Sequence, residues 1–198
     1  MPTSPVARLA VALAGFALVV PIPAAAQEAA PAAERLRVGS ETIDPSGLTE
    51  GTRRYRLILV RGEQQQEIGT AATEVSFVQV GDRAAVRKVQ IIQSDMIGGQ
   101  ADTAHAARDD LAALRVRSAS ANGTVSLDFD EARVTGRVAT TGAEPRSIEQ
   151  TLEERPFAVQ TLDLIVRSLP LEEGAAWEVP VYTADSGELT STRLTVVG

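Results

Sequence analysis

The feature that most constrains this fold is a series of short alternating runs separated by turn residues. In the first clear run, Tyr55, Leu57 and Leu59 alternate with Arg54, Arg56 and Ile58, and the run ends at Arg61-Gly62. Similar runs lie at 68–80, 84–93, 114–118, 124–129, 133–140, 146–152, 177–183 and 189–197. A period of two indicates half-buried strands, and regular spacing with turn signals is typical of an antiparallel sandwich or barrel.

Three local patterns refine the connections between these runs. Asn122-Gly123 lies between two runs and predicts a hairpin with a type I′ turn, in which both central residues have positive φ. Residues 98–100 (Gly-Gly-Gln) are interpreted as a loop. Residues 101–114 are rich in alanine, which is compatible with a helix. The neighbouring runs favour a strand followed by a loop instead.

One segment departs from the strand pattern and predicts a helix at 159–169. Leu162, Ile165, Val166 and Leu169 recur at the spacing of one apolar helix stripe. Asp163 and Arg167 lie four residues apart and are expected to form a weak exposed pair, and Pro170 ends the helix.

The predicted architecture is mainly β. An antiparallel meander forms a curved sheet, half-barrel or barrel, and the short helix at 159–169 packs on its concave face. This β-rich domain is expected to occupy 35–198, preceded by a flexible Ala-, Pro- and Glu-rich lead-in at 27–34.

The first 26 residues have the order of a cleavable secretory signal peptide. Arg8 precedes an apolar run, two prolines end that run, and three alanines lead to a cleavage site after Ala26. A membrane anchor is disfavoured because a spanning helix needs about 20 apolar residues. The chain contains no cysteine and therefore forms no disulfide. Its net charge of −7 argues against binding to nucleic acid or to an anionic membrane.

Motifs that carry catalysis are missing from the sequence. It contains no G-x-S-x-G elbow, no phosphate-binding P-loop and no dinucleotide fingerprint. Its acidic pairs, such as Asp109-Asp110, join adjacent residues that point in different directions. The lone histidine, His105, has only Asp102 and Asp109 as nearby ligands, without a recognised metal spacing, and is interpreted as a surface residue. We therefore predict no catalytic residue, no metal and no cofactor.

Several short segments of the chain form a recognisable set. The most specific are R-S-L-P-L-x-x-G, which begins at Arg167, and V-P-V-Y, which begins at Val179. The others are Asp102-Thr103, Leu111, Phe129-Asp130, Val134-Thr135-Gly136, Pro156-Phe157 and Leu162-Asp163-Leu164. Together these segments resemble a family of exported bacterial β-barrel proteins known as a domain of unknown function, and the resemblance covers roughly the last 100 residues. It implies a periplasmic barrel or half-barrel, similar in outline to lipoprotein-carrier folds, with no established activity. It also implies further strands after Val197, which makes a shortened variant one interpretation of this chain.

Three functions are considered from the sequence, and the third, an enzyme, is the least favoured because catalytic motifs are missing. The first is binding of a hydrophobic or lipid-like ligand in the concavity of the sheet, with Leu162, Ile165, Val166 and Leu169 lining the site. The second is a structural or interaction role in the cell envelope, in which an open sheet edge is offered to a partner protein.

Overall fold

The computed structural model describes residues 32–62, 64–96, 98–184 and 186–197. They belong to one compact unit, Pro31–Gly198. The predicted signal peptide at 1–26 lies outside the described residues, as does most of the lead-in. The first strand of the unit begins at Glu34.

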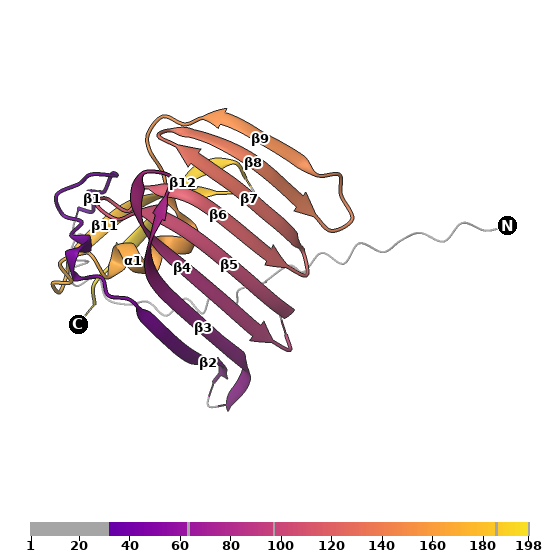
Figure 1. The fold of residues 1–198 in the computed structure, drawn as a ribbon. Helices are drawn as coiled ribbons and strands as arrows, with labels where there is room; N and C mark the ends of the chain where they lie inside the picture. Colours follow the sequence, from indigo (N-terminus) through magenta and orange to yellow (C-terminus); the bar gives the residue numbers. More distant parts are fainter. Residues whose placement is uncertain (1–31, 63, 97, 185, 198) are drawn as a thin grey trace, which may run out of the picture. The chain divides into compact units, whose positions relative to one another are not determined.

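An antiparallel meander of eight strands forms the main sheet, in which each strand pairs with its neighbour in sequence. The strands are β2 (Gly51–Arg61), β3 (Gln64–Val80), β4 (Arg83–Ser94), β5 (Gly98–Ala107), β6 (Ala113–Ser120), β7 (Gly123–Asp130), β8 (Arg133–Thr140) and β9 (Arg146–Thr151). The sheet is curved but open, because its end strands β2 and β9 do not pair with each other (Figure 1). The predicted antiparallel β fold is confirmed, and the main sheet is a curved open sheet rather than a closed barrel.

A small second sheet lies on the concave side of the first. Its central strand, β11 (Ala176–Thr183), pairs in parallel with β1 (Glu34–Arg35) and β10 (Phe157–Ala158), and antiparallel with β12 (Glu188–Thr195). A 3-10 turn, η1 (Pro45–Gly47), precedes β2, and a second, η2 (Val159–Thr161), leads into the helix α1 (Leu162–Val166).

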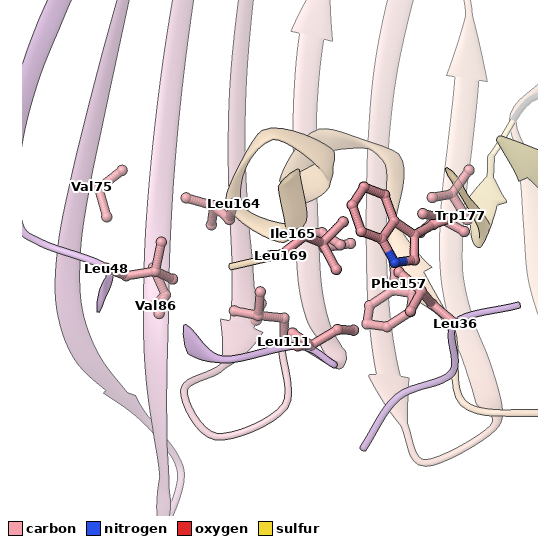
Figure 2. Packing of buried hydrophobic residues seen from close by; sticks show 14 residues of the cluster. Leu36, Leu48, Val75, Val86, Leu111, Phe157, Leu164, Ile165, Leu169 and Trp177 are labelled. Carbon is pink, nitrogen blue, oxygen red and sulfur yellow. The ribbon is translucent and has the colours of Figure 1, made fainter. Parts of the chain in front are cut away.

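The main core lies between α1, the small sheet and one half of the concave face (Figure 2). Val86 on β4 and Ala106 on β5 face Leu164 and Ile165 of α1, and all four are fully buried. A second cluster continues along β6, β7 and β8, where Phe129 meets Tyr182 edge-on with ring centroids 5.6 Å apart. Burial of these apolar side chains is the main force that holds the helix to the sheet.

The helix is shorter than the predicted range, and its buried stripe is shifted. Ile165 and Leu169 are buried as expected, whereas Leu162 and Val166 are only half-buried and Leu164 is fully buried. Thr161 and Ser168 are also buried, because their hydroxyls donate to the carbonyls of Ala158 and Leu164, both at 2.9 Å. The two hydroxyls thus occupy the core-facing stripe while their hydrogen bonds are satisfied within the segment.

The hairpin predicted at Asn122-Gly123 is present, but the prediction of a type I′ turn is wrong. Ser120 pairs with Gly123, so the connecting residues are Ala121 and Asn122, and neither has positive φ. Gly123 is instead the first residue of β7, at φ +140°. The predicted loop at 98–100 is also wrong, because β5 begins at Gly98. The strand and loop predicted within 101–114 are confirmed.

Candidate ligand-binding groove

The uncovered half of the concave face forms a groove beside η2 and α1. One cavity of about 520 Å³ lies between β4, β5 and the helix segment, and an adjoining cavity of about 730 Å³ extends over β6, β7 and β8. Gln100, Val159 and Gln160 line both cavities, so the two form one continuous groove. The volume of each cavity lies in the usual range for small-molecule sites, and both cavities are open to solvent along one side.

The position of the groove follows from a change of side-chain type along each strand. On β5, Ala106 and Ala104 face the core, and the next residues on the same face are Asp102 and Gln100. On β6, Val116 faces the core and Ser118 follows it on the same face. Because alternate residues of a strand share one face, the core ends and a polar groove floor begins where the residues change from apolar to polar.

An ion pair between the buried Lys88 and the exposed Asp163 fixes the helix segment to the groove floor. Lys88 on β4 is buried, and its ammonium group donates to the Gln160 carbonyl at 2.8 Å and to the Asp163 carboxylate. The predicted pairing of Asp163 with Arg167 is therefore wrong. Asp163 faces the sheet because the buried stripe of α1 is shifted from the predicted one.

Asp102 is the second buried charge of the groove floor. It is 5% exposed and accepts hydrogen bonds from the Ser118 hydroxyl and from Gln100 Nε2, the latter at 2.7 Å. Each carboxylate oxygen thus receives one neutral donor. Within the described part of the chain, Asp102 has no ion-pair partner.

A family model described as a protein of unknown function (DUF3108) matches residues 52–198. The chain belongs to the DUF3108 family. The match takes in all eight strands of the main sheet and the groove beneath α1, and it extends further toward the N-terminus than the resemblance seen in the sequence. No curated protein and no solved structure matches the chain.

The four residues predicted to line a ligand site divide between groove and core in the DUF3108 domain. Leu162 and Val166 line the smaller cavity. Ile165 and Leu169 point into the main core and do not reach the groove. Lys88, Asp102 and Ser118 form much of the groove floor, and none of them was predicted to line a ligand site. The sequence signal at Lys88 is its place two residues after the core residue Val86, on the same face of β4.

The convex face of the DUF3108 sheet carries His105 among arginines. His105 pairs in register with Arg87 on β4 and Arg115 on β6, and it lies on the opposite face from Asp102. In the described residues, no group of three or more histidine, aspartate and glutamate side chains could hold a metal ion. Nor does any helix of this part of the chain have the length and apolar character needed to cross a membrane.

The environment of His105 predicts a loss of stability in acid. Burial, assisted by the charges of Arg115, Arg87 and Arg117, lowers the pKa of the His105 imidazole. Below about pH 6.5 the unfolded chain therefore binds more protons at this residue than the folded chain, and stability falls as pH falls. We expect His105→Gln to lose less free energy of unfolding than wild type between pH 7.5 and 5.5. Urea melts across this range measure the difference, and parallel losses in both proteins would contradict the assignment.

Proposed function

We propose that the DUF3108 domain binds a hydrophobic or lipid-like ligand in the groove and does not transform it. The observation that carries this proposal is the continuous groove, whose helix-side wall includes three apolar residues, Val159, Leu162 and Val166, beside the polar Gln160 and Asp163. Val159 is 43% exposed at the junction of the two cavities, and Leu162 and Val166 extend the same wall along α1. Exposed apolar side chains that line a concavity favour binding of an apolar molecule.

The floor of the groove adds polar groups that would orient such a ligand. Gln100 and Ser118 offer amide and hydroxyl groups on the strands opposite the wall, and Gln160 adds an amide beside Val159 on the helix side. An elongated amphiphile, with its chain along the wall and its polar group on the floor, therefore fits the groove better than a pure hydrocarbon. We further propose that binding takes place in the periplasm, on the basis of the export signal read from residues 1–26.

A neutral fluorescent probe tests the proposal. N-phenyl-1-naphthylamine should bind the purified wild-type chain with an increase in fluorescence. Val159→Glu should weaken probe binding roughly tenfold, because it places a charge on the apolar wall that the probe must contact. The matched control is Leu171→Glu, which adds the same charge at an exposed leucine that does not line the groove. Equal effects of the two variants would contradict a groove site.

An interaction role is supported by one separate observation at the open edge of the sheet. β2 is an end strand with four arginines, at positions 53, 54, 56 and 61, and it exposes Tyr55, Ile58 and Val60. An acidic extended segment of a partner protein would complement this edge by adding a strand. Because the edge lies apart from the Val159 wall, such a partner would bind Val159→Glu and wild type equally well.

A further inference from the structure

The strongest unexplained feature of the groove is the buried carboxylate of Asp102. An ionised carboxylate can accept about four hydrogen bonds, and Asp102 receives two, from Ser118 and Gln100. Buried carboxylates are usually paired with a cation, because burial of an isolated charge is costly. Asp102 lacks such a partner among the described residues, and it lines the smaller cavity.

The neighbouring charges do not balance Asp102. Lys88 lies on the adjacent strand and lines the same cavity, but its ammonium group is engaged by Asp163 and by the Gln160 carbonyl. Lys88 and Asp163 together are neutral, so the three charged groups at this end of the groove sum to one negative charge. The floor of the smaller cavity therefore offers acceptors and negative charge to a bound molecule.

From this arrangement we propose that the groove selects amphiphiles with a primary amine, whose ammonium group pairs with Asp102. This inference rests on the proposed binding function and names the class of ligand. An ammonium group has three donors and no acceptor, so it can fill the free acceptor positions of Asp102 and also donate to side-chain amide oxygens of the groove. The apolar chain then lies against Val159, Leu162 and Val166. An anionic head group would meet the negative charge of Asp102 at the same place.

The other end of the groove differs in charge, because the larger cavity is lined by one acidic residue, Glu144, and one basic residue, Arg146. Arg146 on β9 also donates to the Ala184 carbonyl at 3.0 Å. A ligand anchored by an anionic head group would bind at this end and would be independent of Asp102. Comparison of head groups on one alkyl chain separates the two ends.

Displacement of N-phenyl-1-naphthylamine by decylamine, decanol and decanoate, at neutral pH and 0.15 M salt, tests the selectivity. Decylamine should displace the probe from wild type at a concentration roughly tenfold lower than decanol, as expected for one charge-assisted hydrogen-bonded pair, and decanoate should be the weakest. Asp102→Asn should abolish the difference between the two compounds, so that decylamine and decanol displace the probe at similar concentrations. Asp82→Asn removes the same charge from an exposed turn and should leave the ranking as in wild type.

The possible results separate this inference from the proposed function. A wild type that binds no probe would overturn the binding function itself. Probe binding with equal displacement by the amine and the alcohol, or stronger displacement by decanoate, would overturn amine selectivity alone. If Asp102→Asn does not fold, Asp102→Ala replaces it. An amine preference that persists in the folded variant would show that Asp102 is not the anchor.

Discussion

Replacing Ile165 with alanine should lower the free energy of unfolding by about 2–5 kcal/mol. Ile165 is fully buried in the main core, between the small sheet and the concave face of the main sheet (Figure 2). The substitution leaves a cavity among side chains from several elements, so the loss combines lost burial and lost packing. Urea melts measure the change, and a loss below about 1 kcal/mol would indicate a movable lid rather than packed core.

Probe binding and an Asp163 variant complete this test. Ile165→Ala should leave binding of N-phenyl-1-naphthylamine unchanged, because Ile165 does not line the groove.

Asp163→Ala should lower the free energy of unfolding by about 1–3 kcal/mol, because it leaves the buried ammonium of Lys88 with the Gln160 carbonyl alone. An exposed pair with Arg167 would instead predict a few tenths of a kcal/mol. The double variant Lys88→Met/Asp163→Ala should recover part of the loss, since no unpaired charge remains buried.

Gly123→Val should be the second strongly destabilising substitution. A Cβ atom at Gly123 would lie 2.0 Å from the carbonyl oxygen of Ala139 on the neighbouring strand β8. The φ of +140° is also one that a β-branched residue rarely adopts. Backbone strain alone costs about 1–3 kcal/mol, and separation of the β7–β8 pair adds to it. Thermal and urea melts should both show the loss.

Asn122→Val is the matched control for this prediction. Asn122 is exposed in the connection between β6 and β7 and has no positive φ. The same substitution one residue earlier should therefore change the free energy of unfolding by only about 0.5 kcal/mol or less. Equal losses at the two positions would favour a type I′ turn and would contradict the observed register.

The longer strands were predictable from the sequence because each alternates and is bounded by turn residues, whereas the two-residue strands β1 and β10 were missed. The runs at 133–140 and 177–183 agree closely with β8 and β11. The type I′ turn at Asn122-Gly123 was not predictable from the dipeptide alone. A register shift of one residue moves the glycine from the turn into the strand, where contact with Ala139 requires it.

The helix stripe was mispredicted because hydrophobicity does not identify every buried position. Thr161 and Ser168 are core-facing, since their hydroxyls bond to carbonyls of their own segment. A pattern restricted to apolar residues therefore selects Leu162 and Val166, which line the groove, and misses Leu164. The groove floor was not predicted for a related reason. In the sequence, Asp102 and Ser118 look like solvent-facing strand residues, because the pattern does not show which part of the sheet the helix covers.

Native mass spectrometry of the chain isolated from the periplasm of an exporting cell tests the central claim most directly. We expect part of the wild-type protein to carry a noncovalently bound hydrophobic molecule that organic solvent releases, and Val159→Glu to carry much less of it. The Leu171→Glu control should carry the wild-type amount. A wild type that shows only the mass of the bare chain and gives no signal with the neutral probe would contradict ligand binding in the groove.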